Sequence, residues 1–157
     1  MIRGALRFPL QAPPKLPVWD AEPLIEVTIK IPMLAIEKPF SLMVDTGASI
    51  TALHARDVPM LGKRGYRLIR RLNNSSNPSG VGGSAIYFGV PAQIVFEHED
   101  GALEQHDFDL WVAKRARKGS RKLANQLKIP SVLGRDVLCH FRTVMDYPNN
   151  QVFLDHN

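Results

Sequence analysis

FSLMVDTGAS, residues 40–49, joins a continuous apolar segment to an Asp-Thr-Gly turn. The unbroken apolar run predicts a strand that is buried on both faces. A carboxylate at the end of such a strand costs free energy unless hydrogen bonds satisfy it, and Thr46 and the amides of the turn can supply those bonds. Gly47 has no Cβ, so another chain or a substrate can approach its backbone closely. The stretch therefore indicates either an acid held for chemistry, Asp45, or a plain Asx-turn between two strands.

The composition indicates one ordinary globular domain. The chain has 157 residues, of which 45% are hydrophobic and 22% are charged, as is typical of globular proteins. No apolar run approaches the roughly 20 residues that cross a bilayer, and residues 1–10 lack the apolar core of a signal peptide. The single cysteine, Cys139, allows no internal disulfide, which agrees with a reducing compartment. We therefore expect a cytoplasmic protein with no membrane partner.

Short strands separated by turns account for most of the chain. Residues 1–23 contain five prolines and predict an extended arm, so the domain is expected to span residues 24–157. Asp100-Gly101 and Pro148–Asn150 predict hairpin turns, and residues 73–84 predict a polar, glycine-rich loop. Strands are expected at residues 24–31, 40–44, 50–54, 66–72, 85–88, 92–96, 104–113, 131–133, 142–146 and 151–154. This pattern predicts a mostly β barrel or sandwich.

Three motifs follow one another in a set order. The Asp45-Thr46-Gly47-Ala48 turn is followed 35 residues later by Gly80-Val81-Gly82-Gly83, and near the end of the chain comes Val132-Leu133-Gly134-Arg135-Asp136. Together they resemble the retroviral-type aspartic proteases, the single-domain relatives of pepsin, over about residues 24–155. The resemblance implies an all-β fold, a closed β-barrel with one short C-terminal helix, that is active as a dimer.

The resemblance makes Asp45, Thr46 and Gly47 the catalytic turn. The family's chemistry needs two aspartates that face each other across a water molecule and share a proton. One carboxylate takes a proton from the water while the other donates to the scissile carbonyl. No second aspartate in this sequence is followed by Thr-Gly or Ser-Gly. A single chain cannot complete the pair, so the sequence predicts a twofold homodimer with one Asp45 from each subunit.

Other residues receive roles from the same resemblance. Those expected to contact a peptide substrate are Ala48, Ser49 and Ile50 beside the turn, and Gly80, Val81, Gly82 and Gly83 at the tip of a flap. Leu133, Gly134 and Arg135 are expected to be structural, with Gly134 passing close beneath the turn and Arg135 tying the C-terminal helix to it. Viral members often pair this arginine with an aspartate where this chain has Ser49, so Arg135 needs another partner. The terminal hairpin, sealed by Val152 and Leu154, is the expected dimer interface.

We therefore expect an aspartic endopeptidase that cleaves extended peptides or proteins and uses neither a cofactor nor a metal. The alternative is a non-catalytic peptide-binding or dimerisation module with the same fold. A third interpretation, a nucleic-acid-binding β-barrel, rests only on the basic run 114–122, and such runs are more often solvated loops. We do not expect a nucleic-acid partner.

Three other features are interpreted as structural. His98 and His106 flank the Asp100-Gly101 turn, but no third ligand at a suitable spacing supports a metal site there. Cys139 is expected to be a core thiol, and His54 and Trp111 are expected to be packing residues.

Overall fold

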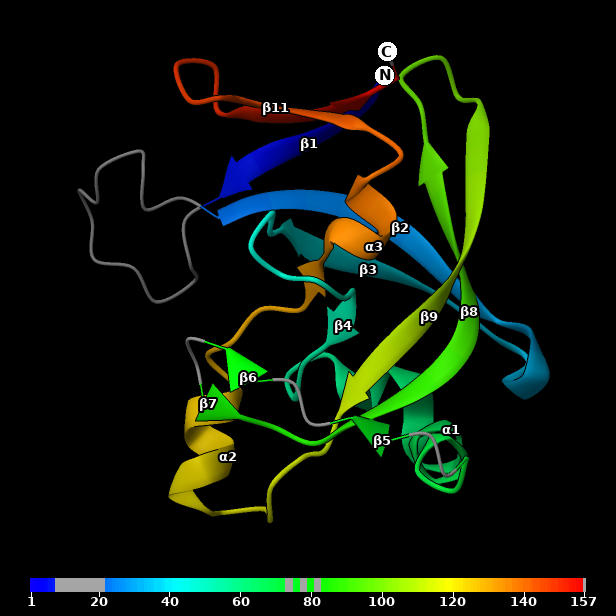
Figure 1. Ribbon diagram of the computed structural model, residues 1–157, viewed down its shortest axis with the longest axis vertical. Helices are drawn as coiled ribbons and strands as arrows, with labels where there is room; N and C mark the ends of the chain where they lie inside the picture. Colours follow the sequence, from blue (N-terminus) through cyan, green and yellow to red (C-terminus); the bar gives the residue numbers. More distant parts are fainter. Residues whose placement is uncertain (8–21, 73–74, 77–78, 81–82, 157) are drawn as a thin grey trace.

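A computed structural model describes residues 1–7, 22–72, 75–76, 79–80 and 83–156 (Figure 1). Strand is the commonest secondary structure in this part of the chain. The strands are β1 (Ile2–Arg7), β2 (Glu22–Ile31), β3 (Ile36–Val44), β4 (Ala52–Leu53), β5 (Ser75–Ser76), β6 (Ser79–Gly80), β7 (Gly83–Ser84), β8 (Tyr87–Glu97), β9 (Leu103–Ala113), β10 (Val132–Leu133), β11 (Arg142–Asp146) and β12 (Gln151–Asp155). The helices are α1 (Gly62–Ile69), α2 (Arg121–Gln126) and α3 (Arg135–Leu138), with 3-10 turns η2 (Pro32–Leu34) and η3 (Val58–Leu61).

The sheet confirms the mostly β class but not the closed barrel. Ten strands form one sheet in the order β11-β12-β1-β2-β3-β10-β4-β9-β8-β5, and β6 pairs with β7 separately. One edge of β2 changes partner along its length: residues 22–24 pair with β1, and residues 28–30 pair with β8. The second pairing joins β2, β3, β10, β4, β9 and β8 in a ring. Because the sheet continues past this ring to β11 and β5, the expectation of a closed barrel is wrong.

The core lies inside this ring of strands. Ile25, Val27, Ile29 and Ile31 of β2 are buried, as their alternation with polar residues predicts. The apolar segment before Asp45 also alternates: Phe40, Leu42 and Val44 are buried, whereas the residues between them are half-buried. The expectation of a strand buried on both faces is therefore only half met, since β3 covers the core with one face.

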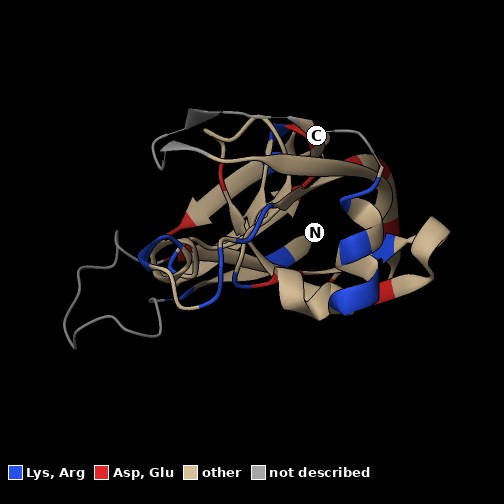
Figure 2. Cartoon of the chain, turned by 90° about the horizontal axis from the view of Figure 1, so that it is seen from below, with Lys and Arg blue, Asp and Glu red and all other residues tan. Residues whose placement is uncertain are grey.

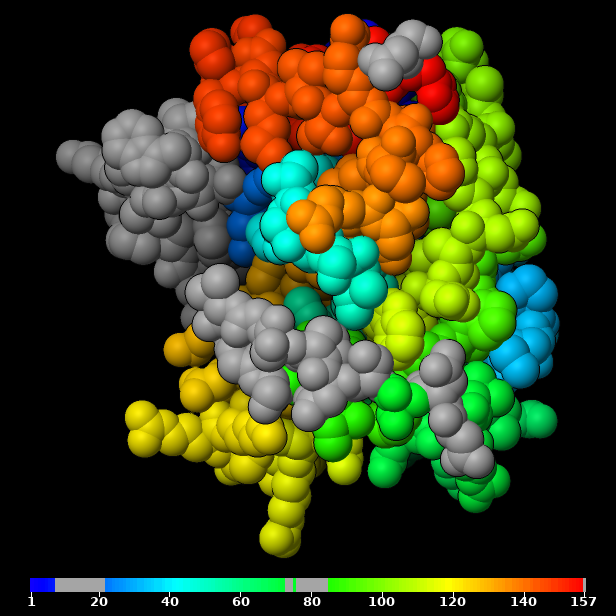
Figure 3. Space-filling model, viewed as in Figure 1, coloured from blue at the N-terminus to red at the C-terminus, as the bar shows by residue number. Residues whose placement is uncertain are grey.

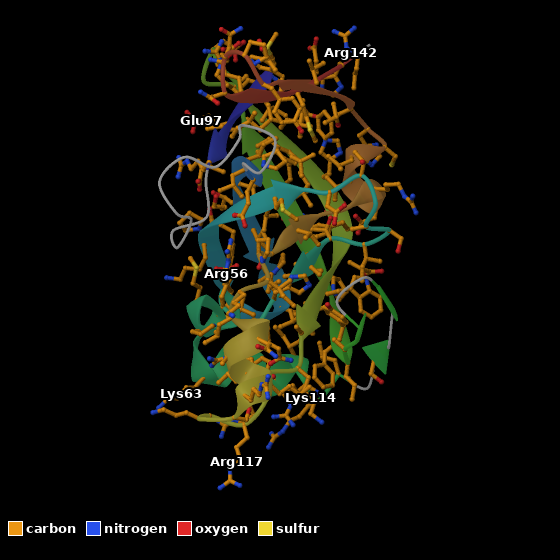
Figure 4. The ribbon with its side chains drawn as sticks, turned by 90° about the vertical axis from the view of Figure 1, so that its left-hand side faces the viewer. Arg56, Lys63, Glu97, Lys114, Arg117 and Arg142 are labelled. Atoms are coloured by element: carbon orange, nitrogen blue, oxygen red, sulfur yellow. The ribbon has the colours of Figure 1, made fainter. Side chains whose placement is uncertain are left out.

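The long hairpin formed by β8 and β9 runs along the molecule. Its register is unbroken from the pair Tyr87–Ala113 to the pair Glu97–Leu103. The strands expected at residues 85–88 and 92–96 are thus one strand, β8, which begins at Tyr87 and continues through Gly89–Pro91. Figure 4 shows Glu97 near one end of the molecule and Lys114 near the other. The hairpin therefore connects the two ends of the fold.

The N-terminal strand and α1 differ from the expected elements. Residues 2–7, expected within a proline-rich arm, form β1 between β12 and β2, with Ile2 and Leu6 buried. The prolines of the arm fall mainly within residues 8–21, which lie outside the described residues. Residues 66–72 are not a strand; most of them lie in α1, where Tyr66 and Ile69, three residues apart, pack against the core from one helix face.

Two further observations concern the whole described chain. In residues 1–7, 22–72, 75–76, 79–80 and 83–156, no helix combines the length and the apolar character needed to cross a membrane. Cys139, expected in the core, is exposed because α3 ends at Leu138 and the cysteine follows as its C-cap.

Because one face of β2 covers the core, substitutions on that face should destabilise the protein far more than substitutions on the exposed face. Ile29 is fully buried where β2 pairs with both β3 and β8. Ile29→Ala should lower the free energy of unfolding by about 2–5 kcal/mol, because it removes buried atoms and leaves a cavity. Glu26→Ala, on the exposed face of the same strand, should change it by less than about 0.5 kcal/mol. Urea unfolding of both variants measures this, and equal losses would contradict the described core.

Candidate active site

The Asp45 turn (residues 45–50) is held by backbone groups. The N–H of Asp45 donates to the carbonyl of Leu133 at 3.1 Å. Its Oδ1 accepts hydrogen bonds from the N–H groups of Gly47, at 2.9 Å, and Ala48, at 3.2 Å. No described group donates to its Oδ2. The amides thus satisfy one carboxylate oxygen and leave the other available to water, a proton or a second carboxyl group.

The Asp45 turn is at the surface of the single chain. Asp45 is half-buried, whereas Thr46, Gly47 and Ser49 are exposed. Figure 3 shows this segment, in cyan, on the front face beside the orange atoms of α3. Contrary to one expectation, the hydroxyl of Thr46 forms no hydrogen bond with Asp45, whose described donors are the amides of Gly47 and Ala48.

Gly134 lies directly against the backbone of the Asp45 turn. β10 pairs in parallel with β3, which sets Leu133 beside Val44, and it also pairs with β4. A Cβ at Gly134 would stand 2.3 Å from the carbonyl oxygen of Ile50 and 2.4 Å from its carbonyl carbon. No side chain fits at that distance. The structure thus places the third motif beneath the first, at the position where the sequence predicted close passage.

Asp136, in α3, makes the link toward the Asp45 turn that the resemblance led us to expect from Arg135. The N–H and the hydroxyl of Thr51, a fully buried residue, donate to the two carboxylate oxygens of Asp136 at 2.8 and 2.7 Å. The same hydroxyl accepts the N–H of Gly134 at 3.0 Å. The Arg135 side chain is exposed and forms no ion pair with a described residue, although its N–H donates to the Ala48 carbonyl at 3.0 Å. The sequence feature that could have revealed this bond is Thr51 itself, a polar residue between the apolar residues Ile50 and Ala52.

His54 is hydrogen-bonded on every side, not merely packed. Its Nδ1 lies within hydrogen-bond distance of the Pro130 carbonyl, and its Nε2 lies 2.8 Å from the Tyr87 hydroxyl. Its backbone N–H donates to Ser131 Oγ at 2.9 Å, and that hydroxyl donates to Asp57. Neither Tyr87 nor Ser131 was identified from the sequence, because both are distant from His54 along the chain.

Burial lowers the pKa of His54 below 6.5, against the opposing influence of the Pro130 carbonyl and the negative charges of Asp57 and Asp45. Burial also raises the pKa of Tyr87. Near neutral pH, both side chains of the His54–Tyr87 pair are therefore uncharged.

The expected flap is described in part. β6 and β7 pair as an antiparallel hairpin, with Gly80 opposite Gly83. Val81 and Gly82, which were expected at its tip, lie outside the described residues. In Figures 1 and 4 this hairpin lies below the loop that follows β3, on the same side of the molecule. A hairpin is thus present at the position in the chain where the resemblance implies a flap.

The basic run 114–122 leads into α2. Ser120 caps this helix, since its Oγ accepts the N–H of Leu123 at 3.1 Å. Figure 2 shows Lys and Arg on both α1 and α2, which lie at the same end of the molecule. No ion pair among the described residues involves the run. The acidic β8–β9 hairpin therefore does not neutralise it by direct contact.

In comparisons with family models and with curated proteins, no family model and no curated protein matches this chain. The function of the chain is therefore inferred from its own residues.

The structure brings together the Asp45 turn, Leu133 and Gly134, while Arg135 joins them only through its backbone.

Removal of the Thr51 hydroxyl should measurably lower the stability of the protein. Thr51→Val should lower the free energy of unfolding by about 1–3 kcal/mol, because the N–H of Gly134 and one oxygen of Asp136 lose their partner in a buried site. Thr28→Val, the same exchange on half-buried β2, removes a hydroxyl with no described hydrogen bond and should cost less than about 0.5 kcal/mol. Chemical denaturation compares the two variants, and equal effects would show that the Thr51–Asp136 bonds do not stabilise the fold.

The lowered pKa of His54 predicts a pH-dependent stability. Between its ordinary value of 6.5 and its lower value in the folded protein, the unfolded chain binds more protons at this residue than the folded chain. The His54 contribution to stability should therefore fall as pH falls through that range. His54→Gln should flatten this part of the curve of unfolding free energy against pH. Parallel curves for the two proteins would contradict a buried, neutral imidazole.

Proposed function

We propose that this chain is an aspartic endopeptidase of the retroviral type, in which two copies each contribute one Asp45. The observation that carries the proposal is that only one of the two carboxylate oxygens of Asp45 accepts hydrogen bonds from described residues. Two amides fix Asp45 through Oδ1, while Oδ2 accepts no hydrogen bond from the described residues and the turn is exposed. A purely structural Asx-turn has no need of a buried strand, a glycine at 134 and a clamp at Thr51 to position it.

The nearby aspartates support a second copy as the source of the other acid. Asp136 is occupied by Thr51, and Asp57 accepts from Ser131 and pairs with Arg56 at 3.2 Å. Neither is free to face Asp45. A second chain brings an identical carboxylate to a twofold axis without new residues, which is the commonest symmetry of homo-oligomers.

The proposed chemistry uses the two acids unequally. Two carboxyl groups that face each other across one water molecule share a proton, so their pKa values belong to the pair. The ionised group takes a proton from the water molecule between them, and the water oxygen attacks the scissile carbonyl carbon. The protonated group donates its proton to the carbonyl oxygen, which gives a tetrahedral intermediate. The acid that took the proton from water then passes it to the amide nitrogen as the C–N bond breaks, and the other carboxylate takes back a hydroxyl proton as the carbonyl group re-forms. The amides of Gly47 and Ala48 keep each carboxylate in place, so little reorganisation is needed during the reaction.

The substrate we infer is an extended polypeptide. Exposed Gly47 offers backbone groups to a strand-like peptide, and the β6–β7 hairpin is the candidate cover. Ala48 and Ile50 are half-buried and small or apolar, so they fit subsites for apolar side chains. Ser49 adds no charge to this wall.

The dimer interface needs a change from the sequence expectation. Val152 and Leu154 are fully buried in the core of their own chain, so they cannot seal a contact with a partner. β11 instead has an unpaired edge at one end of the sheet, and Val144 and Tyr147 beside it are exposed. We place the proposed dimer contact at this edge.

The proposal predicts that Asp45→Asn abolishes peptide cleavage. Loss of an acid–base group lowers rates by about 10²- to 10⁴-fold, and both acids change together in a homodimer. Asp109→Asn, the same exchange at an exposed position on β9, should cleave like the wild type. The measurement is mass spectrometry of a peptide library incubated with each protein from acidic to neutral pH, with the mass in solution recorded alongside.

Mixing wild-type and Asp45→Asn chains distinguishes a catalytic pair shared between two chains from a site that is complete in one chain. An excess of inactive Asp45→Asn chain should lower the activity of wild-type chain, because mixed dimers lack one acid. Undiminished activity in the mixture would contradict the shared dyad. Peptide binding without cleavage at any pH would favour the non-catalytic module.

A further inference from the structure

Histidines gather at the end of the molecule opposite α1 and α2. Four of the five histidines in the chain lie there: His98, His106, His140 and His156. Two of them flank the tip of the β8–β9 hairpin, and His156 follows β12. Figure 1 shows the two chain ends beside this hairpin tip. The cluster takes no part in the proposed cleavage, so it calls for its own explanation.

Glu104 is the centre of this cluster. Its Oε2 lies 2.7 Å from Nε2 of His98 and 2.8 Å from Nε2 of His156. Its Oε1 lies 2.6 Å from Nε2 of His106. The rings of His98 and His156 are stacked, 16° from parallel, so two imidazoles present the same nitrogen to one oxygen.

We infer that His98, Glu104 and His156 form a binding site for a divalent transition-metal ion such as Zn²⁺. One ligand atom from each residue lies within 4.8 Å of the other two. Two imidazole nitrogens and one carboxylate oxygen are a known ligand set for zinc, with a fourth position left to water. Tetrahedral bonds of the usual length set ligand atoms about 3.4 Å apart. Sub-ångström outward movements of the two imidazoles from Glu104 therefore make room for the ion.

The surroundings of Glu104 suit a cation. His98 and Glu104 are mostly covered, with side chains 17% and 19% exposed, whereas His156 is 53% exposed. The exposed side gives the ion an entry path.

His106 orients the carboxylate from outside the ligand set. Its Nε2 bonds the oxygen that the metal does not use, and its ring packs edge-on against Phe96 and Phe141. Carboxylates that bind a metal are usually held in turn by a hydrogen bond from an outer residue, and His106 provides one here. The other nitrogen of His98, Nδ1, lies 3.1 Å from the Met1 nitrogen.

The site joins segments that are distant in the sequence. His98 and Glu104 belong to the hairpin formed by β8 and β9, whereas His156 lies 52 residues beyond Glu104. The metal would hold the end of β12 against that hairpin. Because it binds only the folded arrangement, it should stabilise the protein in proportion to its occupancy.

Metal binding is measured with the full chain after treatment with a chelator and exchange into chelator-free buffer. Titration calorimetry with ZnCl₂ should show one site per chain, and Zn²⁺ should raise the melting temperature. CaCl₂ should do neither, because imidazoles are poor ligands for this hard cation. Glu104→Gln and His156→Gln should each weaken Zn²⁺ binding by about a hundredfold or more, since loss of an outer-shell partner alone costs about 10- to 100-fold.

His140→Gln is the matched control. His140 is exposed and stacks on His106 at 4.7 Å between ring centroids, but it does not face Glu104. This variant should bind Zn²⁺ like the wild type. No saturable binding by the wild type at micromolar Zn²⁺, or binding that His156→Gln leaves unchanged, would overturn the inference. Loss of binding in His140→Gln equal to that in His156→Gln would overturn the ligand assignment, and melting curves without metal verify that each variant is folded.

Discussion

The backbone of Gly134 lies against the backbone of Ile50 with no space for a side chain, and the geometry of the candidate site depends on this contact. The contact brings the N–H of Gly134 to the Thr51 hydroxyl, and it brings β10 beside the end of β3. The Leu133 carbonyl then receives the N–H of Asp45. The acid is thus positioned by main-chain groups and one buried hydroxyl, which have little freedom to move. Such preorganisation is what acid–base chemistry requires of its supporting residues.

In the proposed protease, a single chain would hold half of the catalytic site. The turn is rigid from beneath, yet its outer side is exposed and one carboxylate oxygen has no described partner. If the second acid comes from another copy, cleavage depends on association and therefore on the concentration of the chain. A lone protomer carries one Asp45 carboxyl group and lacks the second acid that the proposed chemistry needs. The proposed activity would then be switched by assembly, without a separate inhibitory segment.

Local patterns predicted the parts of the fold that depend on near neighbours in sequence. The alternation in β2 and the Asp100-Gly101 turn both correspond to observed elements. Tyr66 to Leu72 was misassigned because a short apolar run fits a strand and a helix equally well. The expectation of a closed barrel was wrong because the sheet continues past the ring of strands to β11 and β5, and no local pattern encodes these long-range pairings. Asp136 and Tyr87 were missed as partners of Thr51 and His54, and His156 was missed as a neighbour of Glu104, because tertiary contacts between distant residues have no fixed spacing.

The β8–β9 hairpin has a consequence for communication within the molecule. Eleven strand residues at about 3.3 Å each make a ladder about 35 Å long. Glu104 lies near one end, and Tyr87, the partner of His54, lies at the other. Screening reduces electrostatic influence over about 8 Å at physiological ionic strength. A charge that arrives at the Glu104 end is therefore screened from the Tyr87 end, and the ladder of paired strands provides a direct mechanical connection between them.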